Sequence, residues 1–275
     1  MVACSHPCFP IVSAIQDRSA TLAPMSDPLP VRVAWRSFPD VAIHATESAV
    51  KQHPLYAAAK AGDVQAAFAL VDDTLSRNAT DSLLTRLARV LNLRWLPVIA
   101  EEAFGVNRIP LAVAEALAAR LGGTVDSAIG QSNTVGHTGA SGWHRLAFPA
   151  LFRGTVDERA HYVLVDDFVG QGGTLANLRG YVELNGGIVE AATTLTGQAR
   201  SAVLRVSPGT LVALQSRHGT ELENLWRSWF GYDLDALTES EARYLLRAEN
   251  IDTIRVRLLA ARRREDAGGA PADQG

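Results

Sequence analysis

The sequence predicts an α/β fold: a mostly parallel central sheet of about five strands, with helical additions at the N- and C-terminal ends. From residue 94 to 196, short apolar runs alternate with helical stretches, which is the pattern of a parallel sheet. The run 163–165 (Val-Leu-Val) is unbroken, as in a strand covered on both faces. The stretches before and after this region carry helix signals.

The composition and charge of the chain narrow the kinds of partner that it can have. The chain has 275 residues, 47% hydrophobic and 20% charged, which is ordinary for a globular protein. A net charge of −3 supplies no basic field, so nucleic acid is disfavoured as a partner. No apolar run reaches the ~20 residues of a membrane span, and no secretory signal is seen, so we expect a cytoplasmic protein without a membrane partner. Cys4 and Cys8 lack the partners of a zinc site.

Five segments are expected along the chain. They are a disordered extension (1–30), a helical N-terminal segment acting as a lid or hood (31–90), an α/β core (91–200), a helical C-terminal segment (201–264) and a disordered tail (265–275). The stretch 53–63 resembles one ankyrin-type helix-turn-helix. A solenoid needs at least three such repeats and no second copy is found, so a packing subdomain or lid is favoured over an interaction module.

The expected elements of the core follow from apolar runs and from the proline and glycine residues that interrupt them. Pro97 suggests that the first strand, 94–100, has an edge or entry position, and 101–108 reads as a loop. Pro110 opens a helix that ends near 121. The further strands are expected over 124–130, 148–154, 161–166 and 188–196, with a helix over 174–185. Beyond the core, Ser207-Pro208 starts a helix that Gly219 stops, and Thr238 with Glu241 forms a capping box.

The segment 163–175 (Val-Leu-Val-Asp-Asp-Phe-Val-Gly-Gln-Gly-Gly-Thr-Leu) carries the clearest chemistry. Asp166 and Asp167 end an apolar strand, where open α/β sheets bind ligands. The glycines that follow allow a tight loop whose N–H groups converge on an anion at a helix start. Acids for hydroxyl groups beside a nest for phosphate predict a sugar-phosphate site.

This segment resembles the phosphoribosyl-pyrophosphate (PRPP) signature of type I phosphoribosyltransferases. The resemblance implies that Asp166 and Asp167 accept hydrogen bonds from the ribose 2- and 3-hydroxyls and serve as metal ligands for Mg²⁺. It also implies that the loop holds the 5-phosphate. The cofactor-binding residues of this loop are Gly170, Gln171, Gly172, Gly173 and Thr174. The family usually has Thr or Ser where this chain has Gly170 and Gln171.

The stretch 103–112 (Ala-Phe-Gly-Val-Asn-Arg-Ile-Pro-Leu-Ala) resembles the pyrophosphate loop of orotate-type phosphoribosyltransferases. The resemblance makes Arg108 the candidate pyrophosphate-binding cation, aided by Asn107 and the backbone amides of 105–108. The alternative is that Arg108 merely ends the loop in solvent. A helix N-terminus in the next residues favours anions.

The polar, glycine-rich stretch 131–145 lies where this family has its flexible catalytic loop. It contains no lysine, although the orotate-type enzymes have one there. His137, His144 and Arg145 are the candidates for donating to the pyrophosphate or acting as a general acid. Lysine is scarce throughout: Lys51 and Lys60 are the only two in the chain.

The resemblance implies transfer of a phosphoribosyl group from PRPP to a nitrogenous base, with Mg²⁺ and release of pyrophosphate. The expected partners are therefore PRPP and a base or nucleotide, with a homodimer as the expected assembly. The alternative is a non-catalytic PRPP- or nucleotide-sensing regulator on the same fold, supported by the departure at Gly170-Gln171 and the lysine-free loop. No Gly-x-Ser-x-Gly elbow supports a hydrolase.

Overall fold

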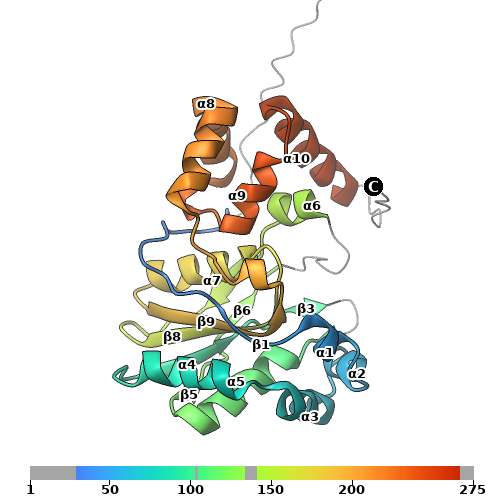
Figure 1. The fold of residues 1–275 in the computed structure, drawn as a ribbon, viewed down its shortest axis with the longest axis vertical. Helices are drawn as coiled ribbons and strands as arrows, with labels where there is room; N and C mark the ends of the chain where they lie inside the picture. Colours follow the sequence, from blue (N-terminus) through green and yellow to red (C-terminus); the bar gives the residue numbers. More distant parts are fainter. Residues whose placement is uncertain (1–28, 103–104, 134–140, 267–275) are drawn as a thin grey trace, which may run out of the picture.

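The computed structural model describes residues 29–102, 105–133 and 141–266. Its centre is a five-stranded, wholly parallel sheet in the order β1-β9-β8-β2-β5, which confirms the predicted fold class. The strands are β1 (Ala42–Ala45), β2 (Leu93–Pro97), β5 (Thr124–Val125), β8 (His161–Val169) and β9 (Ile188–Gly197). Helices cover both faces, and further helices stand above one of them (Figure 1).

The lower layer of Figure 1 is built by helices that precede and follow β2. They are α1 (Glu47–Lys51), α2 (Tyr56–Lys60), α3 (Val64–Thr74), α4 (Arg77–Leu87) and α5 (Ile109–Leu121). Side chains alternate along β8, so Val163 and Val165 face this layer and share its core with Leu117 of α5. The helical N-terminal segment is thus an integral layer of the fold.

On the opposite face, Tyr162 and Leu164 of β8 pack against α7 (Gly173–Leu184). Above α7 stand the C-terminal helices, joined by α6 from the middle of the chain (Figure 1). They are α6 (Gly142–Ala147), α8 (Pro208–Phe230), α9 (Glu239–Leu246) and α10 (Ile251–Asp266). The same apolar core runs from Leu164 up to Trp226 and Leu258, so this upper group is continuous with the α/β body.

Several expected elements differ in the structure. The stretch 148–154 is not a sheet strand: only β7 (Phe152–Gly154) is extended, and it pairs antiparallel with β6 (Ile129–Gln131), away from the central sheet. Its place among the five is taken by β1. The predicted strand 124–130 divides into β5 and β6, because Asp126 turns the chain by accepting a hydrogen bond from the N–H of Ala128.

Other boundaries also shift. Pro97 is at the carboxyl end of an inner strand, not at an edge. The expected loop 101–108 contains the hairpin β3 (Glu101–Glu102) and β4 (Gly105–Val106). Gly219, at a φ of 63°, breaks α8 into two consecutive helical pieces, whereas the capping box at Thr238 and Glu241 is confirmed.

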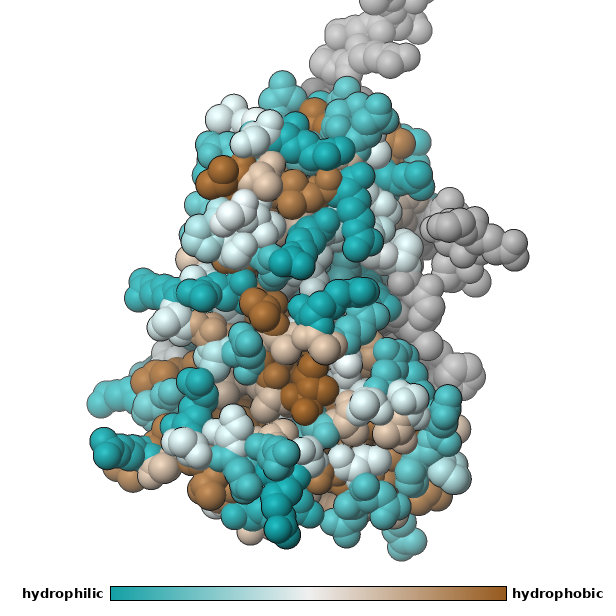
Figure 2. All heavy atoms as spheres, in the orientation of Figure 1, coloured by the Kyte–Doolittle hydropathy of each residue, from teal (hydrophilic) through white to brown (hydrophobic). Residues whose placement is uncertain are grey.

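The surface of the molecule is mostly hydrophilic on the face that Figure 2 shows, and apolar residues appear there as small patches. In the described ranges, none of the helices has the length and apolar character needed to cross a bilayer. Most of the predicted disordered extension (1–30) and tail (265–275) lies outside the described residues, as does His137.

Candidate functional site

The acidic pair lies near the carboxyl end of β8, three residues before the strand ends at Val169. Because side chains alternate along a strand, Asp166 continues the face of Leu164 toward α7, and Asp167 continues the face of Val165 toward the N-terminal helices. The N–H of Asp167 donates to Oδ1 of Asp166 at 2.8 Å. The two carboxylates therefore lie at the carboxyl end of β8, on opposite faces of the sheet.

Asp166 is the buried member of the pair, with 8% of its surface exposed. Burial raises its pKa well above the ordinary value, and the neighbouring charge of Asp167 raises it further. Such a carboxyl holds its proton to higher pH than a free aspartate does. It therefore offers a hydroxyl donor as well as an acceptor to a ligand.

The loop after β8 opens into a helix start suited to an anion. Gly172 is left-handed, with a φ of 80°, and no side chain caps the first turn of α7. The leading N–H groups of a helix have no intrahelical acceptor, so an uncapped N-terminus is available to a phosphate. Thr174, in this first turn, adds a partly buried hydroxyl.

Arg145 is brought to this loop from α6. A Cβ atom placed on Gly170 would come within 2.9 Å of Nη1 of Arg145, so the guanidinium occupies the space that a side chain at 170 would need. This explains why glycine stands where the resembling family has Thr or Ser. The N–H groups of the Arg145 guanidinium thus lie beside the loop, in the place of the side-chain hydroxyl that Thr or Ser would supply at position 170.

Gln171 is held by the C-terminal helices. Its carbonyl oxygen accepts a hydrogen bond from Oγ1 of Thr238 at 2.5 Å. Its side-chain Oε1 is buried, and no hydrogen-bond partner for it is found in the described part of the chain. Thr238 thus fixes the loop backbone, and the side-chain oxygen of Gln171 is buried without a hydrogen bond to the described residues.

The second predicted loop lies beside β8 as well, because it follows the neighbouring strand β2. Arg108 stands at the start of α5, and its N–H donates to the carbonyl of Ala59 on α2 at 3.3 Å. Its side-chain Nε is buried without a hydrogen-bond partner among the described residues. Asn107, in contrast, uses its Oδ1 to accept from the N–H of Ile109, which fixes the turn that leads into α5.

Of the remaining candidates, His144 lies on α6 next to Arg145, with its ring 4.9 Å from that of Phe148. The structure therefore brings together the acidic pair, the 170–174 loop and Arg145, and it places Arg108 on the adjoining loop. His137 has no described position.

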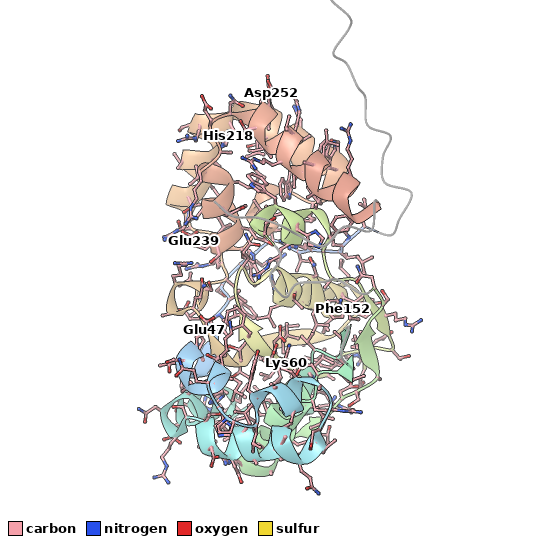
Figure 3. All side chains as sticks on the ribbon, turned by 90° about the vertical axis from the view of Figure 1, so that its right-hand side faces the viewer. Glu47, Lys60, Phe152, His218, Glu239 and Asp252 are labelled. Carbon is pink, nitrogen blue, oxygen red and sulfur yellow. The ribbon has the colours of Figure 1, made fainter. Side chains whose placement is uncertain are left out.

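Sequence reasoning missed Lys60. Its Nζ lies 3.1 Å from Oδ2 of Asp167, and both side chains are largely buried, with 23% and 15% exposed. Lys51 is also at this end of β8, with its Nζ 4.6 Å from the ring centroid of Phe168. Figure 3 shows Lys60 where α2 meets the sheet. The scarcity of lysine, with both residues in one helical stretch, was a signal that could have pointed here.

Comparison with known proteins gives two relatives. The chain is 41% identical over 231 residues to the Escherichia coli protein TraN, covering 84% of this chain and 51% of TraN. It is 39% identical over 153 residues to an uncharacterized Haemophilus influenzae protein, covering 55% of this chain and 34% of that protein. The chain thus spans about half of the first relative and about a third of the second. No protein-family model matches it.

Proposed function

We propose that this protein is a phosphoribosyltransferase: it binds PRPP and transfers the phosphoribosyl group to a nitrogenous base. One observation carries the proposal. The acidic pair Asp166-Asp167 is followed within a few residues by an uncapped helix start, against which Arg145 is packed. A ribose 5-phosphate carries vicinal hydroxyls and a phosphate, which suit carboxylate acceptors followed along the chain by helix N–H donors.

In the proposed reaction, the bond between C1 of the ribose and the pyrophosphate oxygen breaks, and pyrophosphate leaves with the electron pair. A bond forms from the acceptor nitrogen to C1, and that nitrogen gives up its proton where it carries one. The protein's part is to position the ribose with Asp166 and Asp167, to bind the 5-phosphate with the 170–174 loop and Arg145, and to stabilise the leaving charge with Arg108.

Mg²⁺ belongs to the proposal as a partner of the pyrophosphate. In the described ranges, no group of three or more His, Cys, Asp or Glu side chains could hold a metal ion. The acidic pair alone fits Mg²⁺, which is commonly bound through one or two carboxylates plus phosphate oxygens. Asp166 and Asp167 would then hold it together with the ligand, and the ion would supply neutralisation of pyrophosphate charge.

The second candidate is a regulator that binds PRPP or a nucleotide without turnover. Two features favour it: the lysine-free stretch 131–145 and the loop at 170–171, which lacks the usual hydroxyls. Both candidates imply a cytoplasmic location, where PRPP is found, and a homodimer is proposed for either.

Calorimetric titration of PRPP with Mg²⁺ tests both candidates. Wild type should bind, and Asp166→Asn/Asp167→Asn should lose binding. The matched control is Asp72→Asn/Asp73→Asn, an adjacent acidic pair on α3 whose side chains are 79% and 67% exposed; it should bind like wild type.

Pyrophosphate release is then measured against a panel of bases. Release with one base supports the transferase and identifies the acceptor, and binding without release supports the regulator. A folded wild type that fails to bind PRPP would overturn both.

A further inference from the structure

We propose that Lys60 is a ligand-binding residue of this site, which contacts the anionic group on the carbon next to the hydroxyl held by Asp167. The inference rests on the proposed function of residues 166–174. It deepens that function by assigning a residue to the pyrophosphate at the anomeric carbon of the ligand.

The first step is the position of the ammonium. Nζ of Lys60 is 3.1 Å from Oδ2 of Asp167. A ligand hydroxyl bound to that carboxylate would therefore bring the neighbouring carbon of the ligand, and the group on it, close to the ammonium. In the proposed complex, the ribose 2-hydroxyl is bound by Asp167 and the 3-hydroxyl by Asp166. The carbon that adjoins the 2-hydroxyl carbon on the side away from C3 is C1, which bears the pyrophosphate of PRPP. An ammonium at this position faces the leaving group and not the 5-phosphate.

The second step is the contact between α2 and the loop that carries Arg108. Ala59, next to Lys60, accepts the N–H of Arg108. A Cβ on Gly105 would lie 2.7 Å from the carbonyl oxygen of Ala61, so this loop and the end of α2 are packed backbone to backbone. The end of α2, which carries Lys60, and the loop that carries Arg108 are therefore fixed to each other through their backbones.

The third step is charge. The loop 170–174 can receive the 5-phosphate through α7 and Arg145, but a pyrophosphate at the other end of the ribose brings additional negative charge next to Asp166 and Asp167. Two carboxylates alone would repel it. Lys60 offsets this repulsion, and as one of only two lysines it supplies the ammonium that the stretch 131–145 lacks.

The test compares two probes that differ in the anomeric group: PRPP and ribose 5-phosphate. Lys60→Gln should weaken PRPP binding at least tenfold, measured by calorimetry, and should change ribose 5-phosphate binding less than threefold. Lys60→Arg should recover most of the PRPP affinity. Arg120→Gln, at a half-exposed cation near the end of α5, is the control and should bind both probes like wild type.

A second measurement reads the lysine directly. Acetylation of amines followed by peptide mass spectrometry reports on only two lysine side chains. Saturating PRPP should protect Lys60 several-fold, and ribose 5-phosphate should protect it little.

The outcomes separate the two proposals. If wild type binds PRPP but Lys60→Gln weakens both probes equally or neither, the role of Lys60 is wrong and the proposed site stands. If thermally stable wild type binds neither probe, the proposed site itself is wrong and the inference falls with it.

Discussion

The guanidinium of Arg32 and the carboxylate of Glu241 form a two-point ion pair, with N–O distances of 2.6 and 2.9 Å across 209 positions of sequence. Both side chains are 3% exposed. Glu241 also accepts from the N–H of Thr238, whose hydroxyl donates to Gln171 in the candidate phosphate loop. The pair therefore links the N-terminal segment and α9 to the site.

Breaking this pair should destabilise the fold. Arg32→Met leaves a buried carboxylate without its cation, which costs about 3–5 kcal/mol in the free energy of unfolding. Urea unfolding measures it. Arg32→Met/Glu241→Gln should lose less than the sum of the single changes, and Arg227→Met, at an exposed ion pair with Asp233, should lose under about 1 kcal/mol. A loss of that small size at Arg32 would show that the pair is not structurally important.

Asp166→Asn should raise stability at neutral pH while weakening ligand binding. The folded pKa of Asp166 is raised, so the folded state binds more protons than the unfolded state between the ordinary value and the raised one, and stability falls as pH rises through that window. Asparagine removes this loss. Thermal unfolding at pH 4 and pH 8 should show a higher Tm for the variant only at pH 8. An equal shift at both pH values would argue against the protonated carboxyl.

Arg145→Ala should lower the affinity for PRPP about tenfold or more, since a hydrogen bond to a charged group contributes about 1.5–3 kcal/mol. Burial lowers the pKa of this guanidinium, so its charge is partly removed from water in the folded protein. Arg153→Ala, at an exposed position of β7, is the control and should bind like wild type. Unchanged binding by Arg145→Ala would separate this residue from the phosphate loop.

His44 should make the fold acid-sensitive. Burial lowers its pKa from 6.5 to about 4, and its Nε2 lies 3.0 Å from Oγ1 of Thr193 on β9. Between pH 6.5 and pH 4 the unfolded state therefore binds a proton on His44 that the folded state does not. The free energy of unfolding is highest above pH 6.5 and falls as the pH drops toward 4, by up to about 3 kcal/mol. His44→Gln should flatten this part of the pH profile in urea unfolding. A profile identical to that of wild type would assign the acid sensitivity elsewhere.

Gly180→Ala should destabilise the protein by about 1–3 kcal/mol or more, because the added Cβ would lie 2.0 Å from the carbonyl oxygen of Val31. Gly209→Ala, in α8, is the matched change: its nearest neighbour is 4.0 Å away, so helix propensity should make it neutral or stabilising. Chemical unfolding of both variants measures the difference. A tolerated alanine at 180 would mean that the segment at Val31 is loosely attached.

Local sequence was enough to predict the parts of the site that are contiguous. The strand, the acidic pair, the glycine turn and the helix from 163 to 185 follow one another, and each depends mainly on its immediate neighbours. The same holds for the helix after Arg108 and for the capping box at Thr238. These elements were predicted within a few residues of their observed bounds.

Contacts between residues far apart in the sequence could not be predicted from local sequence patterns. The strand β1 is only four residues long and reads Ala-Ile-His-Ala, and its extended form depends on parallel pairing with β9. The stretch 148–154 has a stronger apolar pattern, but it pairs outside the sheet. Lys60 meets Asp167 across 107 positions, and nothing in the local pattern of α2 encodes that meeting.

The segment 29–41 has a consequence for how the chain is made. Its contacts are with residues synthesised much later: Trp35 donates to the carbonyl of Asp235, Val41 to that of Ala202, and Arg32 pairs with Glu241. On a ribosome, these partners emerge only after the last strand of the central sheet, β9, has been translated. The contacts of this segment can therefore form only after the helices that follow the sheet have been synthesised, so its docking is a late step in folding during translation.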